Sequence, residues 1–174
     1  MVISILRYIM LLVLVVWLGS IIFFGTVMAP VLFKTLPSNI AGDVVGPSLN
    51  ALHWIGLAAG MVFLGVFVAL SARLPKTIFD ILVPALIFLM LLLTAVSQFY
   101  VIPQMETLRP QIAGYTYVTP VPDWEKRAAE ARQEFDLFHR WSTRLEGTVL
   151  ILGLVVLAWF ARIEFPQTDQ GNSL

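Results

Sequence analysis

Four long apolar segments dominate the sequence and limit what the chain can fold into. They cover residues 5–29, 51–72, 78–100 and 142–163. The hydrocarbon core of a bilayer is about 30 Å thick, and an α-helix needs about 20 apolar residues to cross it. Hydrophobic residues make up 59% of the chain and charged residues only 13%, which is unlike a soluble domain. The sequence therefore predicts an all-α fold, an integral membrane four-helix bundle that forms a single membrane domain over residues 1–174.

Four spans predict that both termini lie on one face of the membrane, which we call side A. The opposite face is side B. The connection between the second and third spans, residues 71–77, falls on side A and contains Arg73 and Lys76. Short loops that are rich in lysine and arginine tend to stay in the cytoplasm. We therefore expect side A, with both termini, to be cytoplasmic.

The longest connection covers residues 101–141 on side B. Its start is expected to be irregular, because Pro103, Pro110 and further prolines interrupt regular structure there. From about residue 123, apolar and small residues recur alternately four and three apart. This pattern predicts an amphipathic helix over about 123–141 that continues into the fourth span without a break. The positions of this heptad seam are Trp124, Ala128, Ala131, Phe135, Phe138, Ser142, Leu145 and Val149. The seam predicts packing against another helix, and it offers a face for self-association or for a membrane-protein partner.

Polar residues in and beside the spans gather toward side B. His139, Thr143 and Glu146 are spaced at i, i+4 and i+7, which places them on one stripe beside the seam. We expect that stripe to face other helices and not lipid. Polar residues of the second and third spans fall at a similar depth. The full candidate set is Asn50, His53, Thr94, Ser97, Gln98, His139, Ser142, Thr143 and Glu146. The sequence therefore predicts a polar vestibule between helices that opens toward side B.

Three interpretations of this vestibule remain open. The polar side chains can simply form hydrogen bonds between helices, each worth about 0.6 to 2 kcal/mol. They can instead bind or pass an ion or a small molecule, since an ionisable residue such as Glu146 inside a membrane is usually functional. The third interpretation is a haem or redox protein in which His53 and His139 ligate the iron.

No cofactor is predicted. The chain has no cysteine, which excludes disulfides, thiolate metal sites and thiol nucleophiles. Copper(I) favours thioether and imidazole ligands, and the weak candidates for such a site are His53, His139, Met28 and Met105. Methionine in a membrane helix more often serves packing. Lysine plus arginine equals aspartate plus glutamate at 11 each, so nothing in the charge indicates nucleic acid as a partner. No triad order, phosphate loop or metalloprotease motif indicates an enzyme.

Two stretches resemble a known family. "WLGSIIFFGTVMAPVLFKTLPSNIAGDVV" and "FHRWSTRLEG" are similar to the bacterial relatives of transmembrane protein 205, a family of unknown function. The resemblance implies a four-span membrane protein of mostly unassigned biochemistry, with a distant similarity to copper-resistance-D-type membrane domains. The family's motif in the last span maps onto His139, Ser142 and the position of Glu146, where the family pattern has asparagine.

The sequence favours a multi-pass protein of a bacterial inner membrane that binds or passes a small solute or ion through the vestibule. An alternative of another class is a structural or assembly subunit of a larger membrane complex, with the long amphipathic helix as its docking face.

Overall fold

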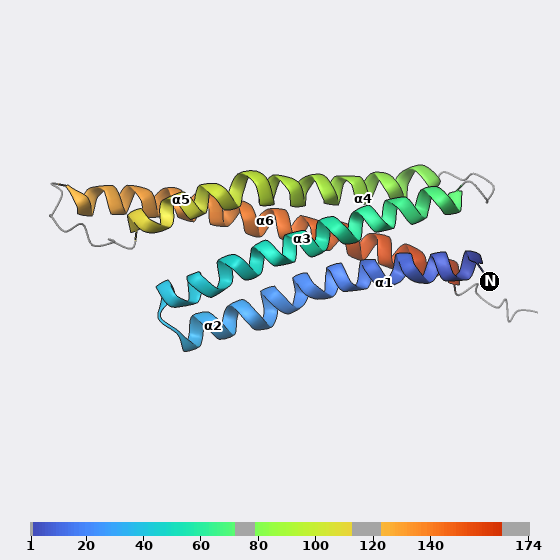
Figure 1. Cartoon of the computed structure of the whole chain (residues 1–174), viewed down its shortest axis with the longest axis horizontal. Coiled ribbons are helices and arrows are strands. Elements are labelled where there is room, and N and C mark those ends of the chain that lie inside the picture. Colours follow the sequence, from blue (N-terminus) through green and yellow to red (C-terminus); the bar gives the residue numbers. More distant parts are fainter. Residues whose placement is uncertain (1, 72–78, 113–122, 165–174) are drawn as a thin grey trace, which may run out of the picture.

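The described residues are helical except for Leu36 and Pro37, between α2 and α3, and Asp123 before α6. The computed structural model describes residues 2–71, 79–112 and 123–164, and no strand occurs in them. In chain order the elements are α1 (Val2–Phe23), the π-helix η1 (Phe24–Met28), α2 (Ala29–Thr35), α3 (Ser38–Ser71), α4 (Phe79–Val96), the π-helix η2 (Ser97–Val101), α5 (Ile102–Ile112) and α6 (Trp124–Glu164) (Figure 1). The predicted all-α class is therefore confirmed. The connection 71–77, on which the predicted orientation depends, lies outside the described residues beyond Ser71.

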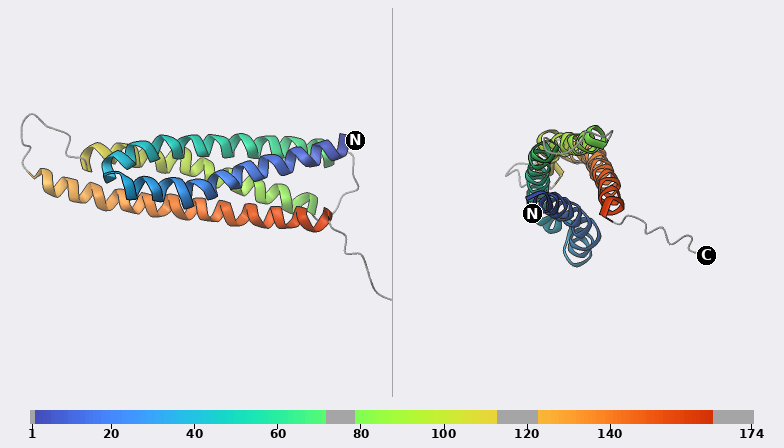
Figure 2. Two further views of the ribbon diagram at one scale, coloured as in Figure 1. Left: turned by 90° about the horizontal axis from the view of Figure 1, so that it is seen from below. Right: turned by 90° about the vertical axis from the view of Figure 1, so that its right-hand side faces the viewer.

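These elements join into four long rods that run alternately in opposite directions (Figures 1 and 2). Four helical stretches are long and apolar enough to cross a membrane: Val2–Thr35, Ser38–Ser71, Ile81–Ile112 and Trp124–Ala161. Each is about 50 Å long at 1.5 Å per residue, whereas the hydrocarbon core is about 30 Å thick. The start of α1 and the end of α6 lie together at one end of the bundle, which is side A. The rods therefore extend beyond the bilayer, and the charged residues of α5 and α6 place that extension on side B.

The prolines near side B do not interrupt the helices as the sequence suggested. Residues 101–112 are helical, with Pro110 inside α5, so the expectation of an irregular start was wrong for these residues. The later prolines of the connection, Pro120 and Pro122, lie outside the described residues. Each of the two π-helices ends two residues before a proline, which is Pro30 for η1 and Pro103 for η2. Proline cannot donate to the carbonyl four residues earlier, and its ring collides with that carbonyl. A wider turn with i to i−5 bonding, as from the Ile102 N–H to the Ser97 carbonyl, lets the helix continue past it.

Glycines in the membrane half of the bundle allow large side chains of neighbouring helices to pack closely in the core. The buried indole of Trp17 on α1 lies against Gly56 and Gly60 of α3, where an added Cβ would collide with the ring. Gly153 of α6 accepts Leu18 of α1 in the same way. Small residues allow membrane helices to approach closely, and the close packing supplies much of their attraction. The contacts among α1, α3, α4 and α6 thus form one hydrophobic core.

The long helix and its seam are confirmed. α6 runs from Trp124 to Glu164 as one element. Along the seam Ala131, Ser142 and Val149 are buried, and the positions between them are half-buried, whereas Trp124 at the start is exposed. The helix that covers the side-B half of this seam is α5, from the same chain. A partner that binds this half of α6 must therefore use a face other than the seam.

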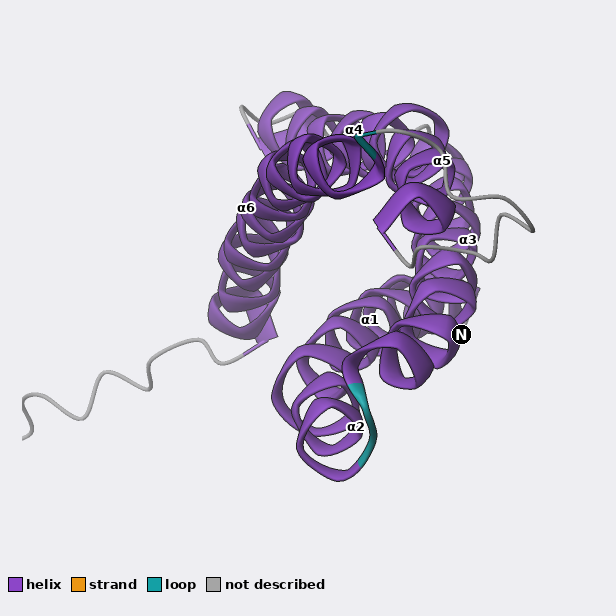
Figure 3. Ribbon diagram, turned by 90° about the vertical axis from the view of Figure 1, so that its left-hand side faces the viewer, coloured by secondary structure: helices purple, strands orange, loops and turns teal. Residues whose placement is uncertain are grey.

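The two helical hairpins at side B differ in polarity. α2 packs against α3 and lies apart from α5 and α6 (Figures 1 and 3). Its exposed side chains include Val31 and Phe33, and those at the start of α3 include Ile40 and Val44. The exposed positions of α6 in the same extension are largely charged. The α2–α3 hairpin therefore exposes more apolar side chains than α6 does at side B, although Lys34 and Asp43 are exposed on it as well.

Candidate functional site

His53 forms the centre of a polar cluster between three helices. It lies on α3 and is wholly buried, with a relative exposure of 0%. Its Nδ1 atom lies 3.1 Å from Oε1 of Gln98, on η2. Its Nε2 atom lies 2.5 Å from Oε1 of Glu146, on α6, which is shorter than an ordinary hydrogen bond between nitrogen and oxygen. Both ring nitrogens of the buried imidazole are therefore paired with side chains from neighbouring helices.

The π-helix η2 holds Gln98 in this cluster. Two aromatic contacts anchor the π-helix, one on each side. Phe99 lies edge-on to Trp54 of α3 with ring centroids 5.8 Å apart, and Tyr100 lies edge-on to Phe138 of α6 at 6.3 Å. Ser97 and Gln98 both face the interior. π-Helical turns occur often at functional sites, because the wider turn presents side chains in a way that an α-helix does not.

Two hydroxyl groups beside the cluster have no hydrogen-bond partner. The Oγ1 atom of Thr94 and the Oγ atom of Ser97 are both buried, with relative exposures of 1% and 0% for the two residues, and neither is satisfied. A buried hydroxyl group without a partner costs about 1 to 3 kcal/mol. Thr94 lies one helical turn from Gln98 toward side A. The polar cluster thus continues inward by one turn and retains unused donors and acceptors.

Toward side B the cluster leads to an open groove between α3 and α5. The groove is lined by Asp43, Gly46, Pro47, Asn50, Ile102, Glu106 and Arg109. Asn50 at its deep end lies three residues before His53, and Ile102 lies four residues after Gln98, so the groove ends about one turn above the cluster. Ser142, which is buried on α6, lies one turn before Glu146. Polar side chains therefore extend from the cluster toward the side-B surface.

Arg109 of α5 stands at the mouth of this groove. Its Nη1 atom donates to the carbonyl oxygen of Gly42 at 2.6 Å, and its Nε atom lies 3.4 Å from Glu106 in an ion pair. The Oδ1 atom of Asp43 lies 3.8 Å from the Nη1 atom of Arg109. A Cβ on Gly46 would stand 2.8 Å from Nη2, so the absence of a side chain there lets the guanidinium lie against α3. The groove mouth is thus charged, and α5 is tied to the first turns of α3.

Two of the candidate residues lie outside the cluster. His139 and Thr143 are exposed on α6, and the Thr143 hydroxyl donates to the His139 carbonyl. The prediction that the whole stripe faces other helices was therefore wrong at these two positions. His139 stacks on Phe135 with ring centroids 6.4 Å apart. At this level Tyr100 of η2 contacts α6 through Phe138, and His139 and Thr143 lie on the side of α6 that stays exposed, whereas Glu146 contacts His53 of α3.

The two histidines do not share a site. His139 lies seven residues before Glu146, or about 10 Å along α6, while His53 contacts Glu146 directly. Both axial ligands of a haem iron must reach the same metal atom, so this arrangement does not fit a haem held between the two imidazoles. The methionines proposed as copper ligands lie on different rods: Met28 is half-buried in η1, and Met105 is buried in α5. Within the described ranges, no group of three or more His, Cys, Asp or Glu residues is arranged to hold a metal ion.

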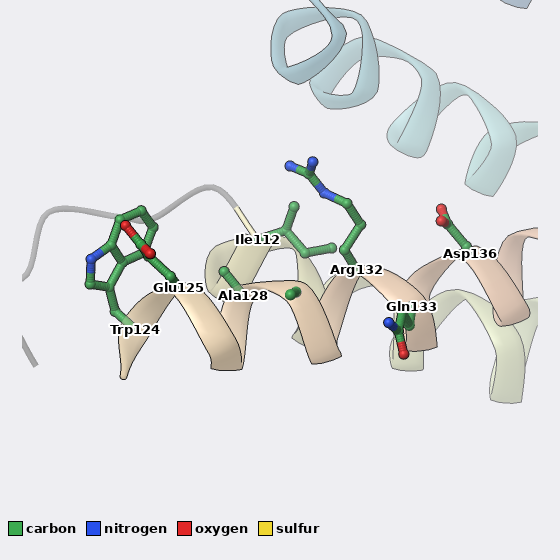
Figure 4. A pocket seen from close by; sticks show the side chains of 8 residues that line it. Ile112, Trp124, Glu125, Ala128, Arg132, Gln133 and Asp136 are labelled. Atoms are coloured by element: carbon green, nitrogen blue, oxygen red, sulfur yellow. The ribbon is translucent and has the colours of Figure 1, made fainter. Parts of the chain in front are cut away.

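A second groove, farther out on side B, lacks the features of a site. Ile112 of α5 and the first three turns of α6 line it, through Trp124, Glu125, Ala128, Ala129, Arg132, Gln133 and Asp136 (Figure 4). Arg132 and Asp136 point to the same side of α6 as an i, i+4 pair of opposite charge. Its polar residues on α6 are exposed to solvent. No buried polar group converges there, so the groove around His53 remains the better candidate.

Sequence reasoning found most members of the cluster but missed its central contact. Asn50, His53, Thr94, Ser97, Gln98, Ser142 and Glu146 were all expected in the vestibule, and all are buried or half-buried. The vestibule was predicted as a set of residues without pairings, and the structure pairs Glu146 with His53. The Arg109–Gly42 contact was not expected either. Its one signal in the sequence was the four-residue spacing of Gly42 and Gly46, which marks a helix face open to close approach.

Comparison with known proteins yields one match. No curated protein and no solved structure matches the chain. A family model described as a domain of unknown function, DUF4149, matches residues 12–114. This range contains His53 and Gln98 and ends before α6, so Glu146 lies beyond it. Because the match covers more than half of the 174 residues, this multi-pass helical membrane protein belongs to the DUF4149 family, whose function is unknown.

Proposed function

We propose that this membrane protein binds a small ion or solute at the polar cluster around His53, which the ligand reaches from side B. The observation that carries the proposal is the 2.5 Å contact between His53 and Glu146 beside a core that is otherwise hydrophobic. Ionisable residues within membrane segments are costly to bury and commonly mark ion or substrate pathways. The groove that ends one turn above His53 supports entry from side B.

The depth of the cluster supports a site just inside the bilayer. His53 lies 18 residues before the end of α3 at Ser71, which corresponds to about 27 Å. Glu146 lies 15 residues before Ala161, or about 22 Å. Measured from side A, both distances fall short of the core thickness of about 30 Å. We further propose a bacterial inner membrane with side A cytoplasmic, and a relationship to the bacterial relatives of transmembrane protein 205.

A second candidate function is that of an assembly subunit. The specific observation in its favour is that Leu137 and Trp141, one turn apart on α6, are both exposed. Because α5 already covers the side-B half of the heptad seam, such a partner, or a second copy of the chain, would bind this outer face.

Two substitutions of Glu146 test the binding site. Glu146→Gln keeps an amide that can bond to His53, whereas Glu146→Leu removes every polar atom. We expect Glu146→Gln to stay folded and to lose ligand-induced thermal stabilisation in a screen of sodium, potassium, magnesium, zinc, copper and small organic ions. Glu146→Leu should melt at a lower temperature, because it leaves the Nε2 atom of the buried imidazole without a partner. Glu134→Gln, at an exposed position of the same helix, is the matched control.

The outcomes separate the alternatives. Suppose that wild type and Glu146→Gln respond equally to ligands and that only Glu146→Leu loses stability. The cluster would then only form hydrogen bonds between helices and would bind no ligand. Native mass spectrometry of the protein released from detergent adds an independent reading. A retained haem or metal mass would favour the redox interpretation, and a retained protein chain would favour the assembly subunit.

A further inference from the structure

The cluster around His53 has a proton count that follows from its hydrogen bonds. The Oε1 atom of Gln98 is an amide oxygen and can only accept, so the Nδ1 atom of His53 must carry a hydrogen. In a neutral imidazole the other nitrogen, Nε2, is then an acceptor. A carboxylate oxygen is also an acceptor. The 2.5 Å contact between Nε2 and Glu146 Oε1 therefore requires a proton between the two atoms.

That proton leaves the pair without net charge wherever it resides. On Nε2 it makes an imidazolium beside a carboxylate, and on Oε1 it makes a neutral acid beside a neutral imidazole. Loss of the proton would leave a carboxylate facing the lone pair of Nε2 in a mostly buried position, since the Glu146 side chain is only 15% exposed. Burial strongly disfavours an unpaired charge. The proton is thus a ligand on which the contact between α3 and α6 depends.

The donor set does not fit a larger ligand at this point. The short contact leaves no space for an ion between His53 and Glu146. Hard cations such as calcium need six to eight oxygen ligands, whereas the cluster supplies one carboxylate and an amide oxygen that already accepts from His53. A proton needs only the titratable pair and a hydrogen-bonded path.

Polar side chains lie on both sides of the pair, and they extend to the groove toward side B but only as far as Thr94 toward side A. Asn50 and Ser142 lie in the layer above the pair, and the groove begins there. Below the pair, Ser97 and Thr94 offer unpartnered hydroxyls that can hold water or relay a proton. Beyond Thr94 the buried side chains of the described core are hydrophobic, among them Phe63, Ile87 and Met90.

Few charged groups surround the pair. The titratable groups nearest to it on the surrounding elements are Asp43 of α3, Glu106 and Arg109 of α5, and His139, Arg140 and Arg144 of α6. The first three stand at the groove mouth, two to three turns from the pair, and the three on α6 are exposed. The buried side chains of α1 are hydrophobic, and the buried polar groups of α4 and η2 are the hydroxyls of Thr94 and Ser97 and the amide of Gln98. The pair therefore exchanges with groove water and with no other buried acid or base of the described chain.

Building on the proposed function, we propose that the ligand of the site is a proton, which His53 and Glu146 share and exchange with water on side B. Binding the proton holds α3 and α6 together at this level, and releasing it separates the two side chains. Because the polar path ends at Thr94, the site takes up and returns its proton on the same side and does not conduct it across the membrane.

The chain permits a direct test, because it contains only two histidines. In a His139→Gln background every histidine signal in the nitrogen-15 spectrum of the purified protein comes from His53. We expect a pH titration to show Nδ1 protonated throughout and Nε2 passing from a shared-proton signal to a lone-pair signal as pH rises. In the same background, Glu146→Gln should abolish this transition. A potentiometric titration should give about one proton per chain fewer for Glu146→Gln than for its parent.

The outcomes distinguish this inference from the binding function itself. His53 signals that stay constant over the whole pH range in which the protein is folded would overturn the proton assignment. If a solute then still stabilised the parent and not Glu146→Gln, the proposed binding function would stand without it. If neither the pH titration of His53 nor the stabilisation by a solute depended on Glu146, both the proton assignment and the proposed binding function would be rejected. Proteoliposomes test the closed path, since a proton leak that disappears in Glu146→Gln would contradict it. Should Glu146→Gln not fold, His53→Asn supplies the comparison in the potentiometric titration.

Discussion

The guanidinium of Arg109 reaches across from α5 to donate to the main-chain carbonyl of Gly42, at 2.6 Å, and so ties two helices together above the polar groove. We predict that Arg109→Met, which keeps much of the aliphatic stem and removes the donors, destabilises the side-B extension. A hydrogen bond from a charged group contributes about 1.5 to 3 kcal/mol. Hydrogen exchange should show reduced protection at the start of α3, while the membrane half of the bundle stays protected. Arg132→Met, at an exposed site on α6, should leave exchange in α3 unchanged.

Gly56 offers a test of the core contact with Trp17. A methyl group at this position would collide with the indole ring, which is rigid and buried. Gly56→Ala is therefore expected to destabilise the protein by about 1 to 3 kcal/mol, as overpacking usually does. Thermal unfolding in detergent measures the effect. Gly65→Ala is the control, because nothing lies within 4 Å of a Cβ there. Equal melting temperatures for the two variants would show that the Trp17 contact is not fixed.

The heptad seam predicts different costs at two adjacent positions of α6. Phe135 is half-buried on the seam, and Glu134 beside it is exposed. Phe135→Glu should destabilise the α5–α6 hairpin by about 2 kcal/mol, since it removes apolar burial and places a charge against α5. Glu134→Ala should be nearly silent. Limited proteolysis of the side-B extension would report the difference, and similar cleavage of both variants would argue against seam packing in solution.

Membrane orientation can be read by labelling, because the chain has no native cysteine. A cysteine at Lys76, in the short basic connection, is expected to react with an impermeant maleimide only after the cells are opened. A cysteine at Glu130, exposed on α6, should react in intact cells. The reverse pattern would invert the orientation and place the groove on the cytoplasmic face, without changing the number of spans.

The sequence predicts the helices well because each span is a local property. Apolar runs and the seam from Ala128 to Val149 depend on spacing along one helix, and both were recovered. The effect of Pro103 was not predicted, because a proline normally indicates a break in an α-helix and nothing in the sequence indicates the π-helical turn that accommodates it.

The site was predicted in part for a different reason. The set of polar residues was visible in the sequence, but the pairing of His53 with Glu146 depends on how α3 and α6 are aligned, across 93 positions of sequence. His139 and Thr143 share a stripe with Glu146, yet burial of a stripe depends on which helices stand beside it at each level. Near His139 the neighbouring helices contact α6 on the side of Phe138, so the stripe that is partly enclosed at Glu146 is exposed two turns earlier.

The unequal hairpins at side B also determine how the bundle meets the bilayer. Exposed Ile40 and Val44 on α3 lie at about the height of residues 133–137 on α6, counted from the His53–Glu146 contact. Lipid that wets the first hairpin would reach a height at which α6 carries charges. A flat membrane surface cannot cover the apolar side chains of α3 and at the same time leave the charged side chains of α6 in water. A hydrophobic mismatch of this kind is relieved by tilting or by local thickening of the bilayer. The bundle axis should therefore lean, with the α2–α3 tip sunk toward the headgroups and the groove mouth lifted into water.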